Sequence, residues 1–147
     1  MRYAYPITLN RDEEGEYVVT ARDVPEALTS GETKREALLE MSDALGAALA
    51  GYAMKGREIP APSELRPGEA LVPVTPLVAA KLALREAMRQ GNITNTELAR
   101  RLGVSEGAVR RLVDPDHASR LDKVVAALEA LAIASLSRAT GRMPLRG

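Results

Sequence analysis

Prolines between residues 58 and 76 divide this sequence more firmly than any other feature. Five of the nine prolines fall in this stretch, at positions 60, 62, 67, 73 and 76. Proline fixes φ and lacks an amide donor, so no continuous helix crosses the stretch. A short strand at residues 69–72 still fits inside it if it lies at the edge of a sheet. We therefore predict two domains, residues 1–73 and 76–133, followed by a frayed tail over 134–147.

The charged residues separate in the same way. Residues 1–64 carry 7 basic and 12 acidic side chains, whereas residues 65–147 carry 13 basic and 8 acidic ones. Opposite charges in the two parts suggest different partners, with nucleic acid favoured for the basic part. All four tyrosines lie within the first 52 residues, and the chain has no Trp or Phe. The basic part therefore lacks aromatic platforms for stacking single-stranded bases.

Composition also excludes several classes of protein. The chain has no Cys and one His. Disulfides and thiol catalysis are thus excluded, and a transition-metal site is not expected. We predict no cofactor. No uncharged stretch approaches the roughly 18 apolar residues of a membrane span, and the N-terminus has no apolar run of the signal-peptide type. We expect a cytoplasmic protein without membrane contact.

The first part has the pattern of an α+β domain. Residues 3–9, 16–21 and 27–30 are rich in strand formers and are separated by polar or Pro-containing turns. Thr33 with Glu36 three residues later predicts a capped helix start. Apolar residues then recur at helical spacing until Gly56, a plausible stop. With the strand at 69–72, this order predicts a small antiparallel sheet covered by one helix.

The second part has an all-helical pattern. We predict a first helix over 77–90, closed by Gly91, and a last one over 119–133. Between them, Thr94 and Glu97 predict a capped helix start, and that helix ends at Gly103. Ser105 can cap a further helix over 106–113. Two short helices across a tight turn are typical of a helix-turn-helix motif.

Several residues of this motif have specific roles in the prediction. Ala99 is small enough for a close helix crossing, and Gly103 permits a positive φ in the turn. The inner seam should consist of Leu98, Leu102, Val104, Val109 and Leu112. Arginine can fork onto guanine or clamp phosphate, which suits a helix that enters the major groove. The predicted DNA-binding residues are Thr94, Asn95, Thr96, Ser105, Glu106, Gly107, Arg110 and Arg111. A surface helical hairpin with a solvated basic face is the simpler alternative. The small residue, the turn glycine and the apolar seam all occur at the positions that a helix-turn-helix needs, and this favours DNA binding.

Residues 76–131, with the core ELARRLGVS, resemble the DNA-binding domains of phage Cro and C1 repressors. That resemblance implies that the second helix reads the major groove and that the protein is a homodimer or a higher homo-oligomer. The helix would begin near Ser105. Double-stranded operator DNA would be the partner.

The first part resembles HicB antitoxins. The shared pattern consists of EYVVT at 16–20, DVP at 23–25, TSGET at 29–33 and GREIPAPS at 56–63. Two positions depart from it: Ala21-Arg22 stands where the family has an aromatic-Pro pair, and Glu26 replaces Gly. The resemblance implies a partial ribonuclease-H-like fold that binds and blocks a HicA-like toxin, an mRNA-cleaving ribonuclease. It also implies that the second domain represses the protein's own operon.

We predict that the chain is not an enzyme. A ribonuclease-H-like nuclease needs carboxylates on its core strands to hold two metal ions. The strand at residues 3–9 has none, and Glu40 and Asp43 fall on the polar face of the predicted helix. Two alternatives remain open. One is a plain transcription regulator whose N-terminal domain senses a ligand or only dimerises, and the other is a nuclease with unconventionally placed acids.

Overall fold

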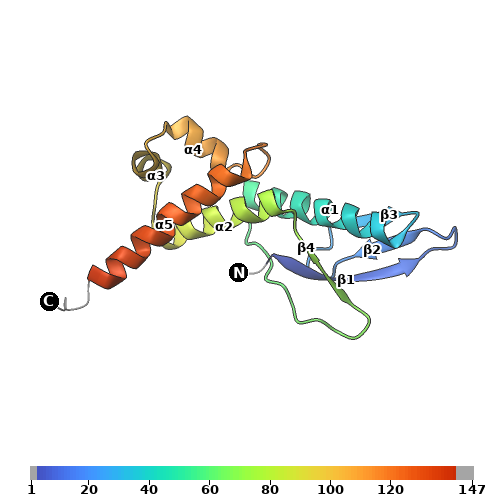
Figure 1. Cartoon of the computed structure of the whole chain (residues 1–147). Helices are drawn as coiled ribbons and strands as arrows, with labels where there is room; N and C mark the ends of the chain where they lie inside the picture. Colours follow the sequence, from blue (N-terminus) through green and yellow to red (C-terminus); the bar gives the residue numbers. More distant parts are fainter. Residues whose placement is uncertain (1–2, 142–147) are drawn as a thin grey trace. The chain divides into compact units, whose positions relative to one another are not determined.

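The computed structural model describes residues 3–141, and the chain forms two compact units that divide between Ala79 and Ala80. Figure 1 labels the helices and strands of both units. Their order along the chain is β1 (Ala4–Arg11), β2 (Tyr17–Thr20), β3 (Leu28–Gly31), α1 (Lys34–Met54), β4 (Ala70–Pro73), α2 (Pro76–Gln90), α3 (Asn95–Leu102), α4 (Glu106–Val113) and α5 (Leu121–Gly141).

The first unit is an antiparallel sheet in the order β3-β2-β1-β4, with α1 lying along it (Figure 1). Tyr5 pairs with Val72, and Leu9 pairs with Val19, so alternate side chains of these strands share one face. The fully buried large side chains of this unit are Tyr5, Ile7, Val19, Val24, Met41, Leu45 and Leu49. This arrangement confirms the predicted α+β fold.

The second unit consists of helices and their connections in its described residues, 80–141. Helices α3 and α4 form a hairpin, and α3 also packs against α5. The buried apolar residues are Leu82, Leu84, Met88, Leu98, Ala99, Val109, Val124, Ala127 and Leu131. The predicted all-helical fold of this part is confirmed.

Three helices end in the same way, with a left-handed residue just after the last turn. Gly56 follows α1 at φ +68°, Asn92 follows α2 at φ +53°, and Gly103 follows α3 at φ +69°. After α2, Ile93 N donates to Met88 O at 2.8 Å and Asn92 N donates to Arg89 O at 3.3 Å. This pair of bonds is the Schellman motif, in which the last carbonyls of a helix find donors.

Two predicted helix ends need correction. Gly91 was expected to close α2, but the left-handed residue is Asn92, because asparagine also tolerates this conformation. The last helix was expected over 119–133, yet α5 runs from Leu121 to Gly141. Residues 134–141 are therefore helical and are not part of an irregular tail. The remaining residues of the predicted tail, 142–147, lie outside the described part.

Candidate nucleic-acid interface

The helix-turn-helix is built from the local signals that predicted it. The Thr94 hydroxyl accepts a bond from Glu97 N at 3.1 Å at the start of α3. The Ser105 hydroxyl does the same for Ala108 N, also at 3.1 Å, at the start of α4. Between them, Gly103 takes the left-handed conformation that the tight turn requires. The two helices begin and end where the sequence predicted.

The seam between the two helices differs from the prediction at one residue. Leu98 and Val109 are fully buried and Ala99 is nearly so, while Leu102 and Leu112 are half-buried. Val104 was expected in this seam but is 44% exposed. The reason is the turn itself: Val104 N donates to Ala99 O at 3.0 Å, which places Val104 outside both helices.

The predicted DNA-binding residues lie at the first turns of α3 and α4 and along one side of α4. Asn95 and Gly107 are half-buried, and the others are exposed: Thr94, Thr96, Ser105, Glu106, Arg110 and Arg111. Arg110 reaches back to Glu106 at 3.8 Å, and both side chains remain about half or more exposed. So loose a pair at the surface holds the guanidinium only weakly. Arg110 is therefore free to exchange Glu106 for another anion.

On α3, one carboxylate binds two arginines. Glu97 accepts from Arg100 and Arg101, whose Nε donates at 2.9 Å. The hydrogen bonds from Arg100, and then those from Arg101, lower the pKa of Glu97 to about 2. Two positive charges thus face one negative charge, and α3 adds to the basic character of the unit.

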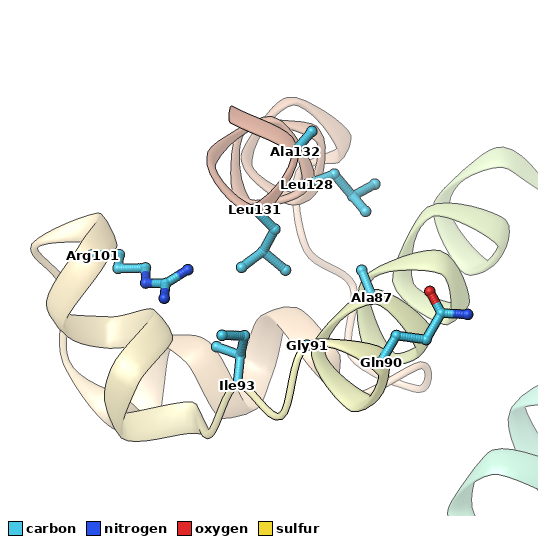
Figure 2. A pocket seen from close by; sticks show the side chains of 8 residues that line it. All are labelled: Ala87, Gln90, Gly91, Ile93, Arg101, Leu128, Leu131 and Ala132. Carbon is cyan, nitrogen blue, oxygen red and sulfur yellow. The ribbon is translucent and has the colours of Figure 1, made fainter. Parts of the chain in front are cut away.

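A cavity of about 340 Å³ lies between α2, α3 and α5. Its lining residues are Ala87, Gln90, Gly91, Ile93, Arg101, Leu128, Leu131 and Ala132. Figure 2 shows the Arg101 guanidinium directed toward Leu131. Arg101 Nη1 is buried and has no hydrogen-bond partner among the described residues. A cavity of this size has room for water, which can satisfy such a nitrogen.

Sequence reasoning missed two basic residues on α2 that contact the end of α4. Lys81 is fully buried, and its Nζ donates to Arg111 O at 2.9 Å. Arg85 Nη1 donates to Val113 O at 3.0 Å. The signal in the sequence was a basic pair spaced by four residues on an otherwise apolar side of the predicted helix, which is rarely buried without partners.

In the first unit, the family-like segments contact one another in two pairs: EYVVT in β2 pairs with TSGET in β3, and the DVP loop binds GREIPAPS. Asp23 accepts two bonds from Ser63, and the Tyr5 hydroxyl donates to Pro60 O at 2.6 Å. Burial, together with the charges of Tyr3, Asp23 and Tyr52, raises the pKa of Tyr5 to about 12. These bonds hold the segment between α1 and β4 against the sheet.

The two positions that depart from the family pattern also make contacts. Arg22 binds Glu69 through two nitrogens, at 2.8 and 3.0 Å, and donates to Glu64 O. The Tyr52 hydroxyl donates to Glu26, and this bond lowers the pKa of Glu26 while it raises that of Tyr52. Arg22 therefore ties the loop after β2 to the segment before β4, whereas Glu26 ties the same loop to α1.

Comparisons with known proteins agree with this architecture. Residues 4–83 match the family model described as the HicB-like antitoxin of bacterial toxin–antitoxin systems. "Antitoxin HicB 2" of Photorhabdus laumondii is 42% identical over 86% of this chain and 89% of its own length. This chain belongs to the HicB antitoxin family. "Antitoxin HicB" of Escherichia coli K12 is also 42% identical, over 86% of this chain and 92% of its own length. "Antitoxin HicB" of Pseudomonas fluorescens is 35% identical over 82% and 83%.

The second unit of this HicB-family chain also matches a known type of domain. Residues 81–115 match a family model described as winged helix-turn-helix DNA-binding. That range includes α3 and α4 and the whole turn between them, so the helix-turn-helix prediction is confirmed. Residues 116–141, which the structure describes, contain α5 and no strand, so a wing does not form there. Within residues 3–141, no helix is both long and apolar enough to cross a membrane.

Proposed function

We propose that this HicB-family protein neutralises a small mRNA-cleaving toxin of the HicA type and represses its own operon by binding operator DNA. The observation that carries the DNA-binding half is α4, an exposed helix with Arg110 and Arg111 on one side. Its N-terminal residues are within reach of base edges when such a helix lies in the major groove. The family membership carries the toxin-binding half.

The charge of each unit supports this division of work. Residues 1–79 carry 8 basic and 13 acidic side chains, and residues 80–147 carry 12 basic and 7 acidic ones. A basic unit favours binding to phosphates, whose contacts supply much of the affinity for DNA. An acidic unit attracts a ribonuclease, which must present a basic surface to RNA.

The DNA-binding proposal is tested with the promoter DNA upstream of the gene. Binding of the wild type and of the Arg110→Ala, Arg111→Ala double mutant is titrated over a salt series. Loss of a base-reading arginine should cost about 1 to 3 kcal/mol and relax sequence preference. Loss of a phosphate-binding arginine should reduce the salt slope by about one for all sequences. An Arg120→Ala, Lys123→Ala double mutant removes the same charge outside the motif. Unchanged affinity of the first mutant, folded by circular dichroism, would show that α4 is not the reading helix.

The toxin-binding proposal is tested with the cognate small ribonuclease encoded beside the gene. The full chain should abolish RNA cleavage by the toxin, and residues 1–79 alone should do so as well if they fold. Because opposite charges steer the encounter, the association rate should fall as salt rises. Residues 80–147 serve as the control and should leave cleavage unchanged. A full chain that binds the toxin when the folded first unit does not would overturn the division of function.

The protein should act on DNA as a homodimer or a higher homo-oligomer. Two copies of α4 about 34 Å apart would contact successive turns of the major groove. The operator should then be an inverted repeat whose half-sites are one helical turn, or a multiple of it, apart. Footprinting tests the spacing, and light scattering tests the number of copies. A monomer that protects a single half-site would contradict this part of the proposal.

The proposal includes no catalysis by the chain itself. Purified protein should leave RNA intact in Mg²⁺ or Mn²⁺. Cleavage that disappears in a Glu40→Gln, Asp43→Asn variant would identify it as a nuclease instead. Failure to bind any neighbouring toxin, with operator binding retained, would favour a plain transcription regulator.

A further inference from the structure

Helix α4 ends differently from the three helices before it. Helices α1, α2 and α3 are each followed by a left-handed residue that lets the helix satisfy its own last carbonyls. Asp114, which follows α4, is extended instead, with φ −79° and ψ 111°, and Pro115 comes next. Its amide satisfies only Arg110 O, at 3.1 Å. The remaining carbonyls at this end need donors from elsewhere in the fold.

Ser119 Oγ donates to Arg111 O at 3.2 Å and His117 N donates to Asp114 O at 3.1 Å, and the other donors come from α2, which lies before the helix-turn-helix in the chain. Lys81 Nζ donates to Arg111 O at 2.9 Å, Asp114 O at 2.8 Å and His117 O at 2.7 Å. It also lies 2.8 Å from the Ser119 hydroxyl. One ammonium, with its three N–H donors, therefore lies within hydrogen-bond distance of four oxygens in the last turn of α4 and the connection to α5. Arg85, one turn further along α2, binds Val113 O.

The environment of Lys81 makes these bonds obligatory. Its side chain is 0% exposed, and a buried charge is tolerated only when its donors are satisfied. Burial lowers the pKa of Lys81, and the nearby carboxylate of Asp114 acts in the opposite direction. A positive charge at this place also interacts favourably with the negative end of the helix dipole. The ammonium and the end of α4 thus fix each other.

We propose that Lys81 is a positioning residue for DNA reading: its buried ammonium holds the last turn of α4 so that Arg110 and Arg111 leave the helix in the geometry that base recognition needs. This inference rests on the proposed function of α4. Lys81 itself faces the interior and does not touch DNA. Bidentate contacts with bases depend strictly on direction, whereas contacts with phosphates tolerate displacement. Loss of the anchor should therefore reduce operator preference more than general affinity for DNA.

The absence of cysteine allows a chemical test of this charge. The Lys81→Cys variant is alkylated while unfolded and is then refolded. Alkylation with 2-bromoethylamine restores an ammonium at nearly the length of lysine, and 1-bromopropane gives an uncharged side chain of the same shape. Lys123→Cys, at an exposed position of α5, receives both treatments as the control.

Dissociation constants are measured for promoter DNA and for scrambled DNA, with folding followed by circular dichroism. We expect the propyl form to bind promoter DNA about tenfold more weakly than the aminoethyl form, as for the loss of one base contact. Both forms should bind scrambled DNA within about twofold of each other, because their phosphate contacts are unchanged. The two forms of the Lys123→Cys control should have the same ratio of promoter to scrambled affinity. A purely structural role for Lys81 would instead lower both affinities together.

Ser119→Ala provides a second variant that keeps the lysine and removes the hydroxyl that contacts both the ammonium and Arg111 O, so it loosens the same end of α4. We expect a smaller loss of promoter preference, with faster hydrogen exchange at the Asp114 amide, which bonds within the last turn of α4. This variant decides the matter if the propyl form does not fold. Promoter preference that is unchanged in Ser119→Ala and in every folded propyl form would overturn the role of Lys81. A wild type with no promoter preference would instead overturn the proposed function, and the inference with it.

Discussion

The carboxylate of Asp23 accepts two hydrogen bonds from Ser63, at 2.7 Å from the backbone nitrogen and at 2.6 Å from the hydroxyl. The two residues are 40 positions apart and belong to two different segments of the HicB-like pattern. The bonds close the long connection between α1 and β4 against the loop that follows β2. This connection has no helix or strand of its own before β4, so such bonds determine its path.

Asp23→Ala should lower the free energy of unfolding of the first unit by about 1 to 3 kcal/mol, because it removes two bonds to a charged acceptor. Urea denaturation measures the difference. Asp43→Ala, at an exposed position of α1, removes the same charge and should change stability by no more than about 0.5 kcal/mol. Equal effects of the two substitutions would contradict the role given to Asp23.

Acid should weaken the connection between Arg22 and Glu69. The hydrogen bonds from Arg22 lower the pKa of Glu69 from 4.5 to about 2. A lowered carboxyl pKa means that the stabilisation is complete above about pH 4.5 and is lost as the pH falls toward 2. Urea titrations over this range should show that Arg22→Met is destabilised at neutral pH and approaches the wild type near pH 2. Arg35→Met, at an exposed position of α1, should show no such convergence.

Alkali should act on the buried hydroxyl of Tyr5. Its pKa is raised from 10.0 to about 12, so the bond to Pro60 stabilises the fold below pH 10 and is lost as the pH rises through 12. Titration of tyrosinate absorbance should contain a component near pH 12 that disappears in Tyr5→Phe. Tyr17→Phe should retain that component. A titration of Tyr5 near pH 10 in the folded protein would contradict the burial described above.

The turn of the helix-turn-helix should tolerate side chains according to their backbone preference. A Cβ at Gly103 would meet no atom within 4 Å, so the cost of substitution comes from φ alone. Gly103→Ala should lower the free energy of unfolding of the second unit by about 1 to 2 kcal/mol, and Gly103→Asn by less. Thermal denaturation measures both. A larger loss for Asn than for Ala would indicate a steric constraint instead.

The features that could be predicted from the sequence depend on neighbouring residues. Thr33, Thr94 and Ser105 cap helices because each hydroxyl accepts from an amide three positions later. Gly103 takes the left-handed conformation because its own backbone permits it. Such signals lie within a few residues of one another, and they located the starts of α1, α3 and α4 correctly.

The features that sequence reasoning missed depend on distant parts of the chain. Lys81 is 30 positions from Arg111 and 38 from Ser119, and no local pattern links them. Val104 is apolar and correctly spaced for the seam, yet the turn carries it outside. The predicted DNA-contacting residues stay predictions, because such contacts form only when DNA is bound. The boundary between domains also stays a prediction, because independent folding is a property of separated fragments.

The anchoring of α4 from α2 has a consequence for transplanting this motif into other proteins. A graft that spans residues 94–113 would carry both hydroxyl caps and the turn glycine. Its second helix would lack Lys81, whose ammonium donates to the carbonyl of Arg111 near the C-terminal end of that helix. Portable recognition modules cut from this chain should therefore start upstream of Lys81 and continue past Ser119. By the same reasoning, libraries that seek new target sequences should vary the exposed side of α4 and leave that enclosed segment intact.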